Sequence, residues 1–320
     1  MAITRRDFLF NVAVGVAGLP LLDQIALAQT KAKLGYMKIV DNASLFIASE
    51  KGFFKKEGLE LEIVPMAGGA AIAPAVASGD MQIGWSNVIS LYQAHVEGFD
   101  FKLISGGATN VKGGNDTHAV LVRKDSPIKT AKDLEGKTLA VNNLNNIVHL
   151  MAMAWIDKNG GNPAKVKYVE IPFPQMEAAL TSEKVDAVSV HEPFVAASTG
   201  RGVARVLAHN WGEVVPKFLI ASWFASDKWI QKNKDVVSGF VRAVNQGIDA
   251  INADINGTRD LMIKWTGLSP DLVKKVALPV FEKGISEKDV QVTIDLTHKY
   301  KLISRPFKAG EVISELAPKA

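Results

Sequence analysis

Short apolar runs alternate with helical patterns along most of this chain. Apolar or alternating runs predict four strands at residues 34–40, 59–65, 81–85 and 101–105. Between them, helical runs are predicted at 44–51, where Ser44 is a plausible N-cap, at 70–78, which consists of small residues, and at 87–97. A strict strand–helix alternation is typical of a parallel sheet with helices on its faces, so the first hundred residues predict an α/β unit.

A second series of elements follows the first. Strands are predicted at 119–123, 138–141, 167–171, 186–190 and 205–208, helices at 147–159 and 175–181, and a return strand at 218–224. Beyond residue 227 the pattern is helical, most clearly at 235–254. Residues 75–85 and 178–190 repeat one order, a helix end followed by a strand. We therefore expect an α/β protein with two lobes and mixed, mostly parallel sheets, lobe one comprising 29–116 and 214–320 and lobe two 117–213.

The N-terminus has the pattern of an export signal. Arg5 and Arg6 precede an apolar run at 8–22, and Ala26-Leu27-Ala28 supplies small residues at a cleavage site. The run is short and rich in glycine and alanine for a membrane span, and a buried N-terminal helix is the alternative. The adjacent arginines favour the twin-arginine route, although Phe10 stands where a basic residue is often found. We expect residues 1–28 to be a signal peptide.

Composition narrows the classes of function. The net charge is +4 with no block of basic residues, which disfavours nucleic-acid binding. The chain has no cysteine, which excludes disulfides, thiolate catalysis, cysteine-ligated metal sites and a lipid anchor at the cleavage site. No Ser-His-Asp, paired-carboxylate or metal-spaced cluster stands out. The prediction is a soluble, unanchored periplasmic protein of a Gram-negative host, monomeric, with no catalytic residue, metal or cofactor.

Candidate ligand positions follow the predicted strands, because ligands of open α/β sheets bind beyond the carboxyl ends of the strands. These loops are 41–44, 66–70, 85–87 and 106–109 in lobe one, and 142–146, 172–175 and 191–194 in lobe two. Trp85, His118 and His191 add aromatic and imidazole surface. Each position also has a structural interpretation: turn and cap formation for the small polar residues, packing for Trp85, and internal hydrogen bonding for the histidines. Trp155, Trp211, Trp229 and Trp265 are assigned to packing.

Four segments resemble one family in the order in which they occur. Residues 48–62 (ASEKGFFKKEGLELE), 77–84 (ASGDMQIG), 124–141 and 185–194 are similar to signature segments of the nitrate/sulfonate/taurine type of ABC-transporter solute-binding proteins. The resemblance implies a bilobal type II periplasmic-binding fold with a small-molecule solute between the lobes and an inner-membrane permease as partner. It also implies ligand contacts from Asn42, Ser44, Gly68, Gly69, Ser86, Asn87, Asn145, Asn146 and Glu192. Glu192 has an alternative role as an acceptor for backbone groups or a hinge partner.

The ligand itself is only partly constrained. Apart from Lys112 at their edge, the candidate loops contain no lysine or arginine, which disfavours a bare inorganic anion. The aromatic positions favour an organic solute such as a sulfonate, an aromatic acid or a pyrimidine-like compound. Two alternatives remain open: a pyrimidine-precursor synthase-like enzyme on the same fold, opposed by the missing cysteines and the export signal, and a binding protein that feeds a chemosensory receptor.

Overall fold

The computed structural model describes residues 30–114 and 116–320, and the predicted signal peptide lies outside them. A first five-stranded sheet has the order β2-β1-β3-β12-β4, with β12 antiparallel to both of its neighbours. Its strands are β1 (Thr30–Tyr36), β2 (Leu59–Pro65), β3 (Ile83–Asn87), β4 (Phe101–Ser105) and β12 (Ala221–Ser226). The first strand begins and ends earlier than the predicted 34–40, because the chain turns into a short 3-10 helix, η1 (Val40–Asn42), beyond Tyr36.

A second five-stranded sheet has the order β10-β6-β9-β7-β8, with β6 antiparallel to both of its neighbours. Its strands are β6 (His118–Arg123), β7 (Thr138–Val141), β8 (Lys167–Glu170), β9 (Ala187–His191) and β10 (Ala204–Ala208). In both sheets the first parallel strand lies between the second and the third, and one reversed strand separates the third from the fourth. The internal echo in the sequence therefore reflects two units of the same topology, and the two-lobed α/β fold with mixed sheets is confirmed.

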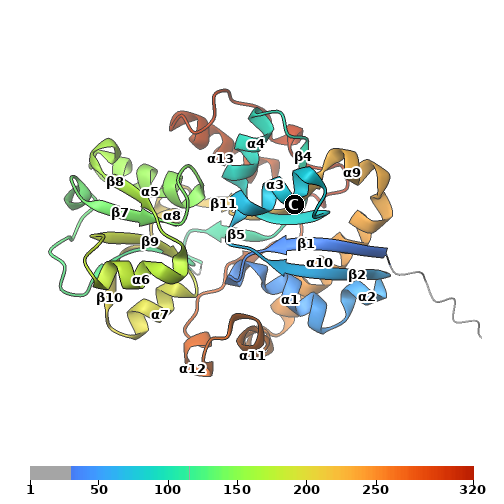
Figure 1. Ribbon diagram of the computed structural model, residues 1–320, viewed down its shortest axis with the longest axis horizontal. Helices are drawn as coiled ribbons and strands as arrows, with labels where there is room; N and C mark the ends of the chain where they lie inside the picture. The colour runs from blue at the N-terminus through green and yellow to red at the C-terminus, as the bar shows by residue number, and fades with distance from the viewer. Residues whose placement is uncertain (1–29, 115) are drawn as a thin grey trace, which may run out of the picture.

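Helices cover both sheets, which lie side by side in Figure 1. We call the first sheet with its helices the first lobe and the second sheet with its helices the second lobe. The helices of the first lobe are α1 (Ala43–Glu50), α2 (Phe53–Lys56), α3 (Gly69–Ser78), α4 (Val88–Val96), α9 (Asp227–Lys232), α10 (Lys234–Ala253), α11 (Ile255–Thr266), α13 (Glu287–Lys299) and the 3-10 helix η4 (Ala309–Glu311). Those of the second lobe are α5 (Ile147–Lys158), α6 (Phe173–Thr181), α7 (Phe194–Gly200), α8 (Asn210–Val214) and the 3-10 helices η2 (Lys132–Leu134) and η3 (Pro163–Lys165). The short helix α12 (Pro270–Val273) follows α11 in the chain but contacts α7 of the second lobe.

A small third sheet lies between the lobes. It consists of β5 (Ala108–Val111), paired antiparallel with β11 (Lys217–Leu219) and with β13 (Val280–Phe281). The prediction of a ligand loop at 106–109 is therefore wrong for Ala108 and Thr109, which belong to a strand. Gly106 and Gly107 permit this pairing, because a Cβ at either position would lie closer than 3.0 Å to backbone atoms of the segments packed against it.

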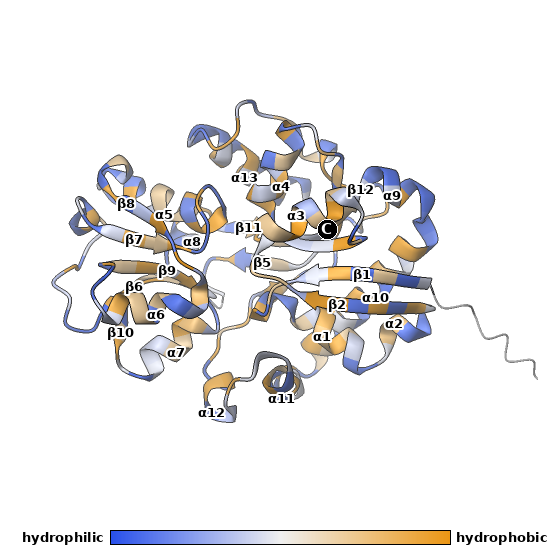
Figure 2. Cartoon of the chain, in the orientation of Figure 1, coloured by the Kyte–Doolittle hydropathy of each residue, from blue (hydrophilic) through white to orange (hydrophobic). Residues whose placement is uncertain are grey.

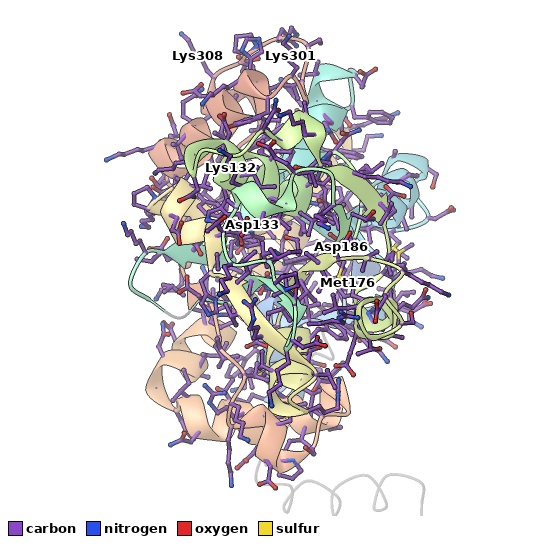
Figure 3. The ribbon with its side chains drawn as sticks, turned by 90° about the vertical axis from the view of Figure 1, so that its left-hand side faces the viewer. Lys132, Asp133, Met176, Asp186, Lys301 and Lys308 are labelled. Atoms are coloured by element: carbon purple, nitrogen blue, oxygen red, sulfur yellow. The ribbon has the colours of Figure 1, made fainter. Side chains whose placement is uncertain are left out.

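The core of each lobe forms where the predicted apolar faces meet the sheets. Phe240, Val244 and Ile248 of α10 are fully buried against the first lobe, as the period of their positions predicts. In Figure 2 hydrophobic residues concentrate along central strands such as β9, whereas α9 at the edge is largely hydrophilic. Figure 3, which faces the second lobe, shows charged side chains projecting outward, with Lys301 and Lys308 at one end of the molecule. Within residues 30–114 and 116–320, no helix combines the length and apolar character that a membrane crossing needs.

Candidate functional site

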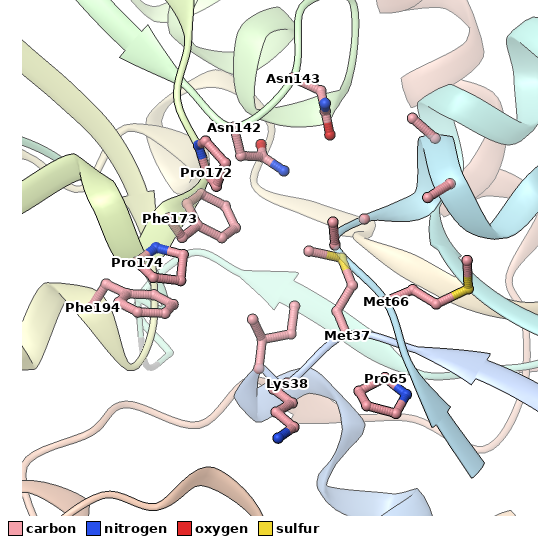
Figure 4. Close-up of a pocket in the computed structure, with 15 residues that line it drawn as sticks. Met37, Lys38, Pro65, Met66, Asn142, Asn143, Pro172, Phe173, Pro174 and Phe194 are labelled. Atoms are coloured by element: carbon pink, nitrogen blue, oxygen red, sulfur yellow. The ribbon is translucent and has the colours of Figure 1, made fainter.

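A cleft of about 490 Å³ separates the two lobes. It lies beyond the carboxyl ends of β1, β2, β7 and β8, the position at which open α/β sheets bind ligands. The first lobe contributes Met37, Lys38, Ile39, Pro65, Met66, Ala67, Gly68, Ala70 and Ala71, and the second lobe contributes Asn142, Asn143, Pro172, Phe173, Pro174 and Phe194. Figure 4 shows Met37 and Met66 on one side of the cleft, with Phe173 and Phe194 on the other.

The walls of this cleft are largely apolar. Thioether side chains from the first lobe face phenyl rings from the second, and Phe173 and Phe194 lie 5.9 Å apart between ring centroids. Among the described residues that line the cleft, the exposed Lys38 at its edge is the one charged residue. Such walls suit a flat or flexible apolar group, because methionine and aromatic side chains adapt to its shape.

A smaller cavity of about 30 Å³ continues the cleft inward. The two share Met37, Ile39, Asn142, Asn143 and Phe173, so they form one continuous site. Deeper in, the wall is more polar and consists of Asp41, Gly69, Trp85, Asn87, Asn146, Ile147, Val148, His191, Trp211 and Ile220. The site is thus apolar at its entrance and polar at its inner end.

One buried contact joins the lobes at this inner end. His191 Nε2, at the end of β9, lies 2.8 Å from Asp41 Oδ1, in the 3-10 helix η1 that follows β1. Both side chains are only 1–3% exposed. The second carboxylate oxygen of Asp41, the Nδ1 of His191 and the indole nitrogens of Trp85 and Trp211 make no hydrogen bond within the described residues. Buried polar atoms are normally paired, so these four atoms are suited to a ligand or to ordered water.

Further hydrogen bonds hold the lobes together at the rim. The Ile147 amide at the start of α5 donates to Asn87 Oδ1 at 3.3 Å, and Gln93 Nε2 donates to the Asn145 carbonyl at 2.8 Å. Asn146 caps α5, since its Oδ1 accepts from the Val148 and His149 amides. The two lobes therefore touch around the cavity, in the arrangement expected of a closed clamp.

Six of the twelve residues proposed from the sequence line the site. The cleft and the inner cavity contain Gly68, Gly69, Trp85, Asn87, Asn146 and His191. Gly68 lies opposite the second lobe, where a Cβ on it would be 3.1 Å from Asn143 Oδ1. Gly69 packs so tightly on Ser86 that any Cβ would collide with its hydroxyl. At both positions the missing Cβ leaves room for a protein side chain.

The other six proposed residues lie outside the lining. Asn42 is buried and donates from Nδ2 to the Met37 carbonyl at 2.8 Å, while Ser44 lies beneath α10. Ser86 is buried behind Gly69, and Asn145 is exposed and contributes only its backbone to the rim.

His118 and Glu192, the last two of these six, have structural partners. The His118 ring stacks on Trp211 at 4.2 Å between centroids, its Nε2 is 2.9 Å from Ser189 Oγ, and burial holds its pKa well below the usual range. The Glu192 carboxylate accepts from the Ala196 and Ala277 amides at 3.0 and 3.2 Å. Burial raises the Glu192 pKa, and these two hydrogen bonds partly oppose the rise. Glu192 therefore ties α7 to the segment before β13, in agreement with its alternative role.

Sequence reasoning missed several lining residues. Asp41 belongs to the proposed segment 41–44, but a carboxylate after a strand is interpreted as a helix cap until its partner 150 positions away is known. Trp211 was assigned to packing, yet it both stacks on His118 and lines the inner cavity. Met37 and Phe173 carry no polar signal, and only the approach of the lobes brings them together.

Acid should destabilise the protein at the loop that carries Asn142, Asn143 and Asn146. His149 Nδ1 accepts the Asn145 amide at 2.9 Å, and burial of the ring lowers the His149 pKa to about 4. The folded protein binds this proton less readily than the unfolded chain, so the free energy of unfolding should fall as the pH drops from about 6.5 to about 4, by up to about 3 kcal/mol. Burial of His118 acts in the same direction. Urea unfolding of the wild type and of His149→Phe at several pH values would measure this loss, which should be smaller in the variant; equal losses would contradict the assignment.

Comparison with known proteins shows that most of this chain is similar to one protein family. Residues 40–254 match the NMT1/THI5-like family. The taurine-binding periplasmic protein of Escherichia coli is 26% identical over 298 residues, covering 91% of this chain and 82% of that protein.

Two solved structures show the same fold at lower identity. The alkanesulfonate-binding protein SsuA from Xanthomonas axonopodis pv. citri, bound to MOPS, superposes with a TM-score of 0.76 at 21% identity and covers 92% of this chain and 100% of that one. The periplasmic nitrate-binding protein NrtA from Synechocystis gives a TM-score of 0.75 at 14% identity, covering 90% of this chain and 86% of that one. These matches agree with the bilobal type II periplasmic-binding fold that the sequence motifs imply.

Proposed function

Because this chain belongs to the NMT1/THI5-like family, we propose that it is the solute-capturing protein of an ABC importer. Its task is to bind one small organic molecule between its two lobes and to present the closed form to a permease in the inner membrane. The taurine-binding relative is periplasmic, and the predicted export signal and the absence of cysteine favour the same compartment for this chain, without a lipid anchor. The clamp is complete within one chain, so we propose that it works as a monomer.

The observation that carries this proposal is the site built from both lobes. Neither lobe alone encloses the cleft, since Met37 and Met66 come from one and Phe173 and Phe194 from the other. A ligand that touches both walls stabilises the closed form by its differential affinity for that form. Domain closure around a ligand is a common switching transition, and closure gives a permease a conformation to recognise.

The walls also bear on the solute. The Met- and Phe-lined entrance favours an organic body, and the described lining holds no arginine and only the exposed Lys38 as a lysine. A bare inorganic anion lacks a fixed buried cation here. We therefore retain a sulfonate, an aromatic acid or a pyrimidine-like compound as the proposed solute class.

Binding without chemical conversion is the simpler role for this site. The serine, threonine and cysteine types of nucleophilic catalysis need a hydroxyl or thiol beside a base. The chain has no cysteine, and no serine or threonine is among the described residues that line the cleft or the inner cavity, although Asp41 and His191 are present there.

Native mass spectrometry of protein purified from a periplasm tests the proposal. A bound solute of defined mass is expected, and re-adding it to stripped protein should raise the melting temperature with a Kd of about 1 μM or tighter, about 8 kcal/mol. Gly68→Phe should abolish binding by filling the cleft, because the extended backbone at Gly68 accepts a side chain. Gly310→Phe places the same ring in open space and should bind normally. Equal binding by both variants would contradict the site.

A further inference from the structure

The polar inner cavity constrains the ligand more sharply than the cleft does. Its volume of about 30 Å³ is small beside the 490 Å³ of the cleft, so it admits only a small terminal group of a ligand. The body of any larger ligand must then lie in the 490 Å³ cleft with which this cavity is continuous. A ligand is therefore recognised in two parts, a small polar head and an apolar body.

The charge on the inner wall opposes an anionic head. Among the described residues that line the inner cavity, Asp41 and His191 are the ionisable ones, and they are bonded to each other. With an ionised carboxylate on Asp41, the pair has a combined charge of zero or minus one. Lys38 is exposed at the outer cleft and is not among the residues of the inner cavity. An anion buried here would lack a positively charged side chain as partner, which is costly for a charge removed from water.

The unpaired atoms indicate both a donor and an acceptor on the head. Asp41 Oδ2 can only accept while the carboxylate is ionised, so it calls for an N–H or O–H from the ligand. The indole nitrogens of Trp85 and Trp211 can only donate, so they call for a ligand acceptor. All three side chains are 2% exposed, which makes an unmet hydrogen bond expensive.

Helix ends at the cavity do not reverse this pattern. The first backbone amides of α5 already donate to the side-chain oxygens of Asn87 and Asn146, so they are not free to bind an anion. Helix α3 begins at Gly69 on the cavity wall and its N-cap Gly68 makes no side-chain cap bond, so it can supply another donor to a ligand acceptor. A neutral oxygen or ring nitrogen can also accept from such a donor.

We infer that the ligand carries a planar, amide-like head, in which an N–H donates to Asp41 and a neighbouring oxygen or ring nitrogen accepts from a tryptophan indole. Carboxamides and amino-substituted nitrogen heterocycles have this donor–acceptor edge. The apolar or aromatic body of the ligand lies between the methionines of the first lobe and the phenylalanines of the second. The inference rests on the proposed function and narrows it, because a simple sulfonate or carboxylate head has acceptors alone.

Three probes that share a phenyl ring and differ in the polar group can distinguish an amide-like head from an anionic one. Benzamide offers a donor and an acceptor, whereas benzoate and benzenesulfonate offer only acceptors and a negative charge. Titration of the mature protein, followed by calorimetry and by the fluorescence of the cavity tryptophans, should show benzamide binding at least about tenfold more tightly than either anion. Such probes are fragments of the solute, so millimolar dissociation constants suffice.

The Asp41→Asn variant should reverse the preference for benzamide over benzoate. Its amide oxygen keeps the acceptor for His191, while its NH₂ group takes the place of the free carboxylate oxygen. Benzamide should then weaken by about tenfold or more, and benzoate should bind more tightly than to the wild type. Asp249→Asn is the matched control, because it removes the same charge from an exposed carboxylate paired with Lys283 on the first lobe and should change neither affinity.

The outcomes distinguish the inference from the proposed function. Tighter binding of benzoate or benzenesulfonate by the wild type, or binding of none of the probes, would overturn the amide-like head. An unchanged preference in Asp41→Asn would overturn the role of Asp41. None of these results affects the co-purification experiment, whose failure would instead remove the proposed function itself.

Discussion

The His191→Ala variant is expected to bind the solute about 100-fold more weakly than the wild type. The substitution removes the 2.8 Å contact that joins the lobes and leaves the Asp41 carboxylate buried without its partner. Loss of one member of a buried pair costs about 3 kcal/mol or more, which is about 100-fold in an equilibrium constant. The cost falls on the closed form, since opening the cleft returns Asp41 to water. Isothermal titration with the co-purified solute would measure the loss.

The double variant Asp41→Ala, His191→Ala distinguishes the cost of leaving a buried carboxylate without its partner from the cost of losing side-chain atoms. Without a carboxylate to desolvate, it should lose less affinity than the two single variants predict when their losses are added. His298→Ala, in the last turn of α13 and away from the cleft, should bind normally. Wild-type affinity in His191→Ala, or strictly additive losses in the double variant, would show that the contact does not hold the lobes closed.

Gly247→Ala is expected to destabilise the first lobe by about 3 kcal/mol, the upper part of the usual range for overpacked cores. Gly247 lies in α10 where this helix crosses α1, and a Cβ at this position would come closer than 3.0 Å to the Ser44 carbonyl oxygen. That neighbour is backbone, so relief requires the two helices to move apart. Chemical denaturation of the mature protein would report the change in the free energy of unfolding.

Gly239→Ala provides the control in the same helix. Its Cβ would lie 3.4 Å from the nearest atom, an ordinary contact with Glu57, and alanine is favoured over glycine within a helix by about 1 kcal/mol. The two substitutions should therefore have opposite signs, Gly239→Ala being neutral to stabilising. A loss of similar size in both variants would indicate that α10 tolerates no added methyl group for reasons other than its contact with α1.

Local patterns in the sequence were sufficient to predict most strands and helices of the two lobes. The strands at 59–65, 101–105 and 138–141 have the predicted bounds, because each is a short apolar or alternating run closed by turn residues. Helix α10 differs from its prediction by one residue at each end, since its apolar stripe is long and regular. The family motifs extended this to the fold, which the matched structures share.

Features that depend on contacts between residues far apart in the chain could not be predicted from the sequence. Strand β5 reads as a glycine-rich loop and becomes a strand only through pairing with segments about 100 and 170 residues later in the chain. The Asp41–His191 contact and the cavity position of Trp211 likewise arise from lobe closure. Every proposed loop except 106–109 contributes a residue to the lining, but which side chain in a loop faces the cleft depends on local backbone geometry, as Asn42 and Asp41 illustrate.

A crystal structure of the mature protein purified with its natural solute would test the central claim most directly. We predict one molecule in the cleft, in contact with Met37 of the first lobe and Phe173 of the second, with its polar end at Asp41. A solute held by one lobe alone, or bound elsewhere while this cleft contains only water, would contradict the account of a two-lobed clamp.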